Sequence, residues 1–140
     1  MEEITTEQLP LAIGRLLTYA TSESKVDAEY ELYLQQENRK LYGYKRNGKF
    51  IGCIGIELTS LNKGEIKHIA VSPIEREHGI GNDMINFICK KHSFSVISAE
   101  TDQDAVNFYK RVGFTVISLG EKYPGVERFW CVCLRKDKEH

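Results

Sequence analysis

The chain has 140 residues, of which 28% are charged and 41% hydrophobic, and its formal net charge is −1. This length and composition fit one soluble globular domain with its own hydrophobic core. The near-neutral charge offers no basic surplus for nucleic acid, and no apolar run reaches the roughly 20 residues that a membrane span needs. We therefore expect a single domain over residues 1–140 that binds neither nucleic acid nor membrane.

The four cysteines are predicted to be reduced thiols rather than disulfides or metal ligands. The N-terminal Met1-Glu2-Glu3-Ile4 is acidic, unlike an export signal, so we expect a cytoplasmic protein whose thiols stay reduced. Cys131 and Cys133 would point to opposite faces of a strand. Cys89 and His92 lack the second pair that a zinc site requires. The sequence therefore predicts no metal site.

In the first half of the chain, apolar residues at helical spacing predict helices over residues 6–20 and 26–36. Strands follow at residues 41–45 and 50–59, and Asn47-Gly48 between them is typical of a hairpin turn. Another turn at residues 62–64 leads to a strand over residues 65–71. Pro73 ends that strand because proline cannot donate to a ladder.

In the second half, the pattern predicts a helix over residues 81–91, a strand over 94–99 and a helix over 105–112 with Thr101 as its N-cap. Strands over residues 114–119 and 128–134 complete the chain. This order predicts an α/β fold with one mixed sheet and helices on both faces. We expect the strand 128–134 to lie at a sheet edge, where a second copy could pair with it as a homodimer.

The segment Arg76-Glu77-His78-Gly79-Ile80-Gly81 connects the strand 65–71 to the next helix. Such a loop presents unpaired backbone N–H groups at the positive end of a helix dipole, which suits a phosphate or diphosphate. Gly79 and Gly81 would let the backbone approach the anion closely. A tight strand-to-helix turn without any ligand explains the same residues. The loop lacks the third glycine of a dinucleotide fingerprint and the Gly-Lys-Ser/Thr of a Walker loop.

A second segment makes the glycine loop more specific as a functional signal. It is Ala105-Val106-Asn107-Phe108-Tyr109-Lys110-Arg111-Val112-Gly113-Phe114. Taken together, the two segments resemble the GNAT superfamily of acyl-coenzyme A-dependent N-acetyltransferases. The family motif is Gln/Arg-x-x-Gly-x-Gly/Ala after an apolar strand, followed by Ala-x-x-Phe-Tyr-x-x-x-Gly-Phe. The resemblance covers about residues 50–134. It implies a mostly antiparallel sheet with splayed central parallel strands, acetyl-CoA as co-substrate and a primary amine, small molecule or peptide, as acceptor.

The resemblance also implies which residues hold the donor. The pantetheine arm would pair with the backbone of the strand before the loop, and the N–H of Val71 would polarise the thioester carbonyl. Asp102 stands where many relatives have an asparagine that holds the pantetheine, so it keeps an acceptor and loses a donor. The implied donor-binding residues are Ile69, Ala70, Val71, Arg76, Glu77, His78, Gly79, Ile80, Gly81 and Asp102.

Tyr109 is the predicted general acid. Ala105, Phe108 and Val112 share one helix face, which places Tyr109 at its border. Within the family motif, a tyrosine there turns its hydroxyl to the thioester sulfur and protonates the departing thiolate. The alternative is a tyrosine that packs its ring and leaves its hydroxyl in water.

Glu65 is the candidate general base, since some family members place a base at the start of this strand to deprotonate the amine through water. His68 is its rival, because histidine titrates near neutrality. Strict alternation predicts that Glu65 and His68 lie on opposite faces of the strand. Alternatively, Glu65 is an exposed carboxylate paired with Lys67.

Acidic residues cluster in the second predicted helix, at Glu23, Asp27, Glu29 and Glu31. They could form a wall that attracts a cationic amine, or a solvated helix face. The sequence thus predicts an acetyl-CoA-dependent N-acetyltransferase that works by direct attack of a primary amine in a ternary complex. A non-catalytic module that binds coenzyme A or a peptide is the alternative.

Overall fold

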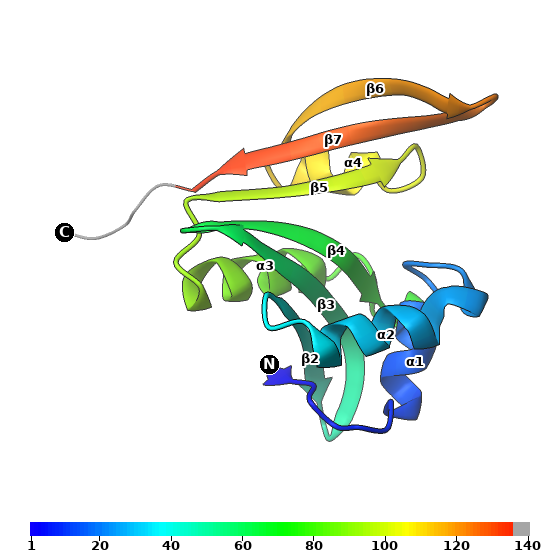
Figure 1. Cartoon of the computed structure of the whole chain (residues 1–140), viewed down its shortest axis with the longest axis vertical. Helices are drawn as coiled ribbons and strands as arrows, with labels where there is room; N and C mark the ends of the chain where they lie inside the picture. Colours follow the sequence, from blue (N-terminus) through cyan, green and yellow to red (C-terminus); the bar gives the residue numbers. More distant parts are fainter. Residues whose placement is uncertain (136–140) are drawn as a thin grey trace.

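Seven strands form one sheet in the order β1-β2-β3-β4-β5-β7-β6 (Figure 1). The computed structural model describes residues 1–135. Neighbouring strands are antiparallel except β4 and β5, which are parallel. The strands are β1 (Glu2–Glu3), β2 (Arg39–Arg46), β3 (Lys49–Ser60), β4 (Lys63–Val71), β5 (Val96–Asp102), β6 (Thr115–Tyr123) and β7 (Val126–Leu134). The predicted mixed, mostly antiparallel sheet is confirmed.

Helices cover both faces of the sheet, also as predicted (Figure 1). The helices α1 and α2 pack on one face of β2, β3 and β4. On the other face of the sheet, α3 packs against β3 and β4, and α4 packs against β6 and β7. They are α1 (Leu11–Leu17), α2 (Val26–Gln35), α3 (Ile80–Lys91) and α4 (Val106–Arg111), with short 3₁₀ turns η1 (Glu23–Lys25) and η2 (Pro73–Glu75). The first helix is shorter than the predicted 6–20, because Pro10 occupies its N-cap and disfavours a helical residue before it.

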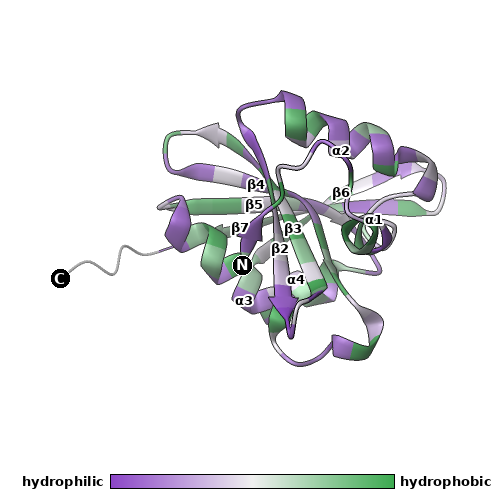
Figure 2. Ribbon diagram, turned by 90° about the horizontal axis from the view of Figure 1, so that it is seen from below, coloured by the Kyte–Doolittle hydropathy of each residue, from purple (hydrophilic) through white to green (hydrophobic). Residues whose placement is uncertain are grey.

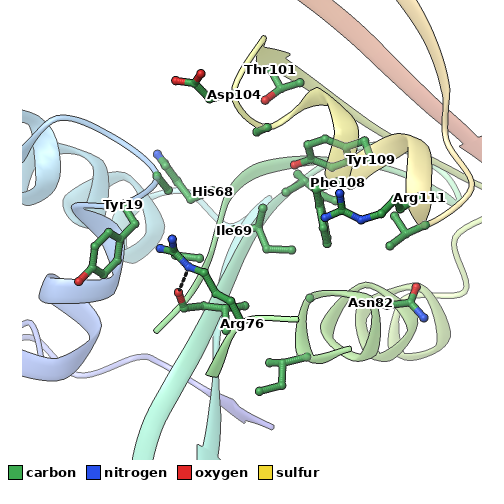
Figure 3. Close-up of a pocket in the computed structure, with 18 of the residues that line it drawn as sticks. Tyr19, His68, Ile69, Arg76, Asn82, Thr101, Asp104, Phe108, Tyr109 and Arg111 are labelled. Carbon is green, nitrogen blue, oxygen red and sulfur yellow. Dashed lines mark hydrogen bonds between the residues drawn. The ribbon is translucent and has the colours of Figure 1, made fainter. Parts of the chain in front are cut away.

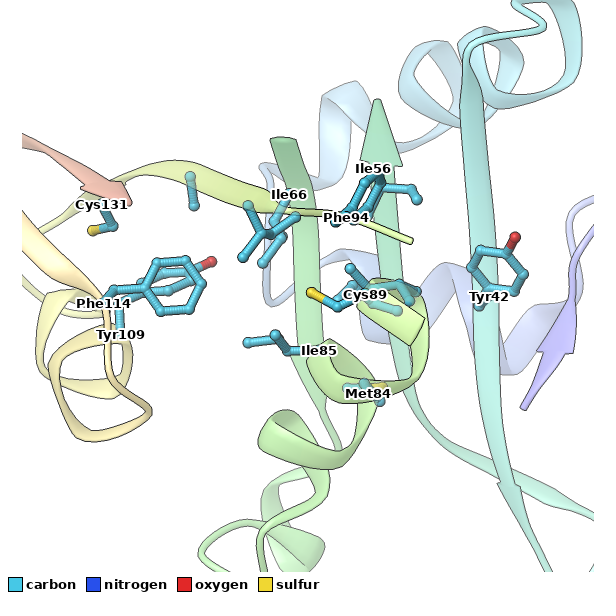
Figure 4. Packing of buried hydrophobic residues seen from close by; sticks show 14 of the residues in the cluster. Tyr42, Ile56, Ile66, Met84, Ile85, Cys89, Phe94, Tyr109, Phe114 and Cys131 are labelled. Atoms are coloured by element: carbon cyan, nitrogen blue, oxygen red, sulfur yellow. The ribbon is translucent and has the colours of Figure 1, made fainter. Parts of the chain in front are cut away.

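Two hydrophobic clusters hold these layers together. The first lies between the sheet and α3 and α4, and Figure 4 shows Ile66 of β4 close to Ile85 and Cys89 of α3. The second lies between the sheet and α1 and α2. Each helix therefore combines hydrophobic and hydrophilic residues (Figure 2), as expected for helices with one buried face.

All four cysteines are free thiols in the structure. Cys53 and Cys131 are fully buried in the two clusters, and burial raises the pKa of the Cys53 thiol to about 12. Within residues 1–135, no group of three His, Cys, Asp or Glu side chains is placed to hold a metal ion. Over the same residues no helix has the length and apolar character needed to cross a membrane.

Two details differ from the prediction. Thr101 belongs to β5 and is 8% exposed, and the Asp102 carboxylate caps the following turn instead by accepting the N–H groups of Asp104 at 3.0 Å and Ala105 at 3.1 Å. Thr101 as N-cap is therefore wrong: strand alternation turns Thr101 into the core, and α4 begins at Val106 with Ala105 as its N-cap. The strand 128–134 is also not an edge: β7 lies between β5 and β6, and β6 is the outer strand.

β4 divides into two halves with different neighbours. In the paired half, residues 63–66, each residue has a partner in β5, and the last pair is Ile66 with Ala99. In the released half, residues 67–71, β4 pairs only with β3, and Figure 1 shows β4 and β5 diverging beyond their paired ends. The predicted splay of the two central parallel strands is therefore confirmed.

A β-bulge marks the boundary between the two halves. His68 is opposite Gly55 and Ile66 is opposite Ile56, so Lys67 has no partner of its own on β3. A bulge adds one residue to a strand and bends it locally. Here the bend coincides with the residue at which β4 leaves β5.

Candidate active site

A cleft of about 1070 Å³ opens where β4 and β5 separate. Its walls are the released half of β4, the C-terminal end of β5, the loop before α3, and α4 (Figure 3). The cleft contains Tyr109 and all of the predicted donor-binding residues except His78. Glu65 lies in the paired half of β4. Within residues 1–135, it does not line the cleft.

The released half of β4 presents free backbone groups to this cleft. Ser72 donates its N–H to Ile51 of β3 at 2.8 Å. Because N–H and C=O groups of a strand alternate in direction, Ala70 also faces β3, whereas Ile69 and Val71 face the side that β5 has left. Arg76 occupies one of these groups, since its Nε donates to the Val71 carbonyl at 2.9 Å (Figure 3).

The loop before α3 curls because two of its residues have positive φ. Glu77 has φ 65° and Gly79, the N-cap of α3, has φ 79°. Glycine adopts this conformation without strain, whereas a non-glycine residue such as Glu77 rarely does. Within residues 1–135, the N-terminus of α3 therefore meets the cleft with unpaired backbone N–H groups, the arrangement that favours an anion.

Gly81 connects the two sequence segments physically. A Cβ at this position would lie 2.7 Å from the ring of Phe108 in α4, which is closer than side-chain carbons approach. Gly81 is buried on the first turn of α3. The absent side chain thus lets α4 pack close to the loop, a role beyond the anion contact that the sequence predicted.

Tyr109 extends from α4 into the cleft, and Figure 3 shows its hydroxyl facing the space above Ile69. The residue is 4% exposed, and its ring makes edge contacts with Phe108 and Phe114, both with centroids 5.1 Å apart. Burial raises the pKa of the hydroxyl above its ordinary value, so the group keeps its proton at neutral pH. Within residues 1–135, the hydroxyl bonds no other protein group, which leaves it free to meet a ligand.

The bulge changes which face of β4 carries which side chain. Ile66 packs against α3, but His68, two residues later, hydrogen-bonds Tyr33 of α2 on the opposite face. Glu65 pairs in register with Glu57, whose partner Arg39 lies over the ring of Tyr33. Glu65 and His68 therefore lie on the same face, and the predicted opposite faces are wrong, because the extra residue at Lys67 breaks the alternation.

Glu65 forms an ion pair with Lys67, with Oε2 and Nζ 3.3 Å apart. Its side chain is 20% exposed. This contact is the one foreseen by the alternative interpretation of Glu65. Lys67 lines the cleft, so this ion pair connects Glu65 to a residue of the cleft wall.

His68 is buried, with 7% of its surface exposed, and both ring nitrogens have neighbours. The Tyr33 hydroxyl lies 2.6 Å from Nδ1, and Oε1 of Glu29 lies 3.4 Å from Nε2. Burial lowers the pKa of His68 to about 4, an effect that the nearby Glu29 carboxylate only partly opposes. The ring is therefore neutral at physiological pH.

The cleft also contains polar residues that the sequence did not single out. Arg111 and Asn82 lie at the end near α3 (Figure 3). At the other end, Arg128 pairs with Glu100 at 3.1 Å. Arg111 follows Tyr109 by two residues in the motif segment, so its charge beside a predicted diphosphate loop could have identified it. The sequence around Arg128 did not indicate that this residue lies in the cleft, because only the sheet order brings β7 beside β5.

The sequence of this chain matches the model of the Acetyltransferase (GNAT) family over residues 4–114. This match covers most of the chain and contains the loop, the released half of β4, and α4. The chain belongs to the GNAT acetyltransferase family.

Individual relatives agree with this assignment. The chain is 33% identical over 78 residues to the uncharacterized N-acetyltransferase in the lysA 3′ region of Bacillus methanolicus, a match that covers 54% of this chain and 64% of that protein. A putative GNAT acetyltransferase from Desulfovibrio desulfuricans has a similar fold, with a TM-score of 0.76, 16% identity, and 95% and 96% of the two chains covered. A GNAT acetyltransferase from Elizabethkingia anophelis with acetyl-CoA bound gives a TM-score of 0.70 at 19% identity, covering 93% and 94%.

Proposed function

We propose that this protein is an N-acetyltransferase that moves an acetyl group from acetyl-CoA to a primary amine by direct attack in a ternary complex. The observation that carries the proposal is the free edge of β4 at Ile69 and Val71, which faces the unbonded hydroxyl of Tyr109 across one cleft. A strand edge and a buried proton donor on opposite sides of a space suit a thioester between them. The structural relative from Elizabethkingia anophelis holds acetyl-CoA, which supports the choice of donor.

The donor would lie along the released half of β4. The pantetheine amides would pair with the outward-facing backbone groups of Ile69 as an additional strand would, while the N–H of Val71 stays free for the thioester carbonyl. The diphosphate would meet the N–H groups of the loop from Glu77 to Gly81 at the N-terminus of α3. Arg76 has one guanidinium nitrogen on the Val71 carbonyl, and its remaining N–H groups are free to add a charge-assisted contact.

In the chemical step, the amine attacks the thioester carbonyl, and negative charge develops on the carbonyl oxygen. The N–H of Val71 stabilises this charge. The carbon–sulfur bond then breaks, and Tyr109 donates its proton to the departing thiolate. Its raised pKa suits this role, because the hydroxyl is protonated when the thiolate forms.

The amine must lose a proton, and Glu65 remains the proposed base. Because Glu65 lies behind Lys67 rather than in the cleft wall, it would act through water. Asp102 is proposed to contact the pantetheine with the carboxylate oxygen that does not cap the turn before α4. We expect a small-molecule or peptide acceptor and a cytoplasmic protein that could form homodimers.

The test is release of free thiol from acetyl-CoA in the presence of amines, polyamines, amino acids and peptides. Acceptor-dependent thiol release is the expected result. Absence of release across a broad panel would favour the alternative, a module of the same fold that binds coenzyme A or a peptide without catalysis. A thermal shift assay distinguishes the acetyltransferase and the coenzyme A-binding module from a simple anion-binding domain. Coenzyme A should stabilise the first two more than plain diphosphate does, since only coenzyme A would use the strand edge.

A further inference from the structure

His68 stands at the point where β4 separates from β5. The last β4–β5 pair is Ile66 with Ala99, Lys67 is the unpartnered bulge residue, and His68 is the next residue along. The backbone orientation of the whole released half depends on how the strand leaves the bulge. A side chain that fixes His68 therefore fixes the direction of Ile69 and Val71.

Tyr33 on α2 provides that contact. Its hydroxyl lies 2.6 Å from Nδ1 of His68, and both residues are buried. The space for this hydroxyl exists because β3 has glycine directly opposite His68: a Cβ at Gly55 would overlap the Tyr33 hydroxyl. A buried hydrogen bond of this kind holds its partners firmly, since breaking it leaves polar atoms without water.

The charge of Glu29 favours one tautomer of His68. Oε1 of Glu29 lies 3.4 Å from Nε2, and a negative carboxylate at this distance favours a proton on Nε2. Nδ1 is then the acceptor for the Tyr33 hydroxyl. Glu29 is itself held by Arg39, at 3.5 Å.

We propose that Tyr33 and Glu29 hold His68 as a positioning residue that preorganises the released half of β4 for the acyl donor. The inference rests on the proposed function for the identity of the ligand. In this arrangement both nitrogens of His68 are engaged, so His68 is not the group that removes the proton of the amine. Two residues of α2 instead act on the donor site through β4, from the face opposite α3.

The test compares Tyr33→Phe with Tyr30→Phe. Both tyrosines lie on α2 and are buried, and each loses its hydrogen bonding to one partner residue on substitution. The Tyr30 hydroxyl donates to the Thr6 carbonyl at 2.5 Å and lies 3.4 Å from Oγ1 of the same threonine. That bond lies far from β4 in the sequence and joins α2 to the N-terminal segment. We expect Tyr33→Phe to weaken coenzyme A binding in titration calorimetry about five- to tenfold, and Tyr30→Phe to bind as the unaltered protein does.

Kinetics separate positioning from catalysis. Tyr33→Phe should raise the KM for acetyl-CoA about as much as it weakens binding, with a smaller effect on kcat and an unchanged shape of the pH profile. His68→Asn should retain most of the affinity, because the asparagine oxygen can accept from Tyr33 close to where Nδ1 does. A catalytic base at His68 predicts the opposite: His68→Asn would lower kcat and remove a limb of the pH profile.

Amide hydrogen exchange tests the inference without any ligand. In the free protein, Tyr33→Phe should speed exchange in the released half of β4 relative to Tyr30→Phe, with no difference in the paired half. Equal exchange in the two variants would overturn the proposal even if the protein bound no coenzyme A. Coenzyme A binding in which Tyr33→Phe and Tyr30→Phe are indistinguishable would also overturn it, and would leave the proposed acetyltransferase activity untouched.

Discussion

The two halves of β4 differ less in sequence than in what lies beside them. Both halves contain one lysine and at least one isoleucine, and both pair with β3. In the paired half, β5 satisfies the outer backbone groups, so that half is a structural element. In the released half the same kind of groups face a cleft with the Tyr109 hydroxyl. The comparison shows that loss of one strand neighbour converts a core strand into a binding edge.

The largest expected effect comes from closing the space at the boundary between the halves. Gly55→Ala places a methyl group where the Tyr33 hydroxyl lies. We expect a loss of about 4 kcal/mol in the free energy of unfolding, from overpacking and the loss of a buried hydrogen bond. Urea denaturation measures this loss.

Gly14→Ala in α1 is the control for that substitution. A Cβ there would meet only the flexible end of Leu9, at 3.2 Å. Alanine also favours the helical conformation over glycine, so this variant should be neutral or more stable. If Gly55→Ala were as stable as Gly14→Ala, the tight packing of Tyr33 against the bulge would be wrong.

His68 should make stability depend on pH. The unfolded chain takes up a proton near pH 6.5, whereas the folded protein does so near pH 4. The stabilising contribution of neutral His68 is therefore complete above about pH 6.5 and decreases as the pH falls towards 4. The decrease should reach about 3 kcal/mol in the free energy of unfolding.

Denaturation curves at several pH values check this dependence. His68→Gln should reduce the slope between pH 6.5 and 4, because glutamine does not titrate. Burial also lowers the pKa of His92, so part of the slope should remain. An unchanged slope in His68→Gln would mean that His68 does not contribute to acid stability.

Tyr109→Phe tests the chemistry that the released half is proposed to support. We expect kcat to fall about 100-fold, equivalent to about 2.7 kcal/mol in the barrier, because the general acid is lost. Coenzyme A affinity should be nearly unchanged, since the ring contacts with Phe108 and Phe114 remain. Tyr123→Phe, on the exposed end of β6, is the control. An unchanged rate in Tyr109→Phe would exclude its acid role.

Glu65→Gln has the smallest expected effect, because Glu65 lies in the paired half and acts through water in our proposal. We expect a few-fold loss of turnover and a shifted or flattened pH dependence. Steady-state rates measured across a range of pH values test both the loss of turnover and the change in pH dependence. An unaltered profile would assign proton removal to bulk water or to another group, and would remove the paired half from the chemistry altogether.

Much of this architecture was predictable from the sequence because it depends on local patterns. The Asn47-Gly48 turn has positive φ at both residues, at 53° and 76°, as the hairpin pattern predicted. The glycine loop and the α4 segment each have a recognisable composition, and the cleft brings them together. Predicted and observed elements agree to within a few residues, apart from the shortened α1 and the two-residue strand β1, which the sequence did not predict.

Apart from the shortened α1, the main errors share one physical cause, which is that pairing between distant strands leaves no local pattern. A period of two assumes regular pairing, so the sequence did not predict the bulge at Lys67 that brings Glu65 and His68 to one face. Sheet order determines whether β7 or β6 is the edge. The contact of His68 with Tyr33 joins residues 35 positions apart, and nothing in either segment indicates it.

The central claim is that the released half of β4 binds the donor through its backbone, and residue-resolved amide exchange with and without coenzyme A tests it most directly. The account predicts slower exchange at Ile69 and Val71 when coenzyme A is present. It predicts little change at Ala70, which faces β3, or at Ile66 in the paired half. Unchanged exchange at Ile69 and Val71 under saturating coenzyme A would contradict the account.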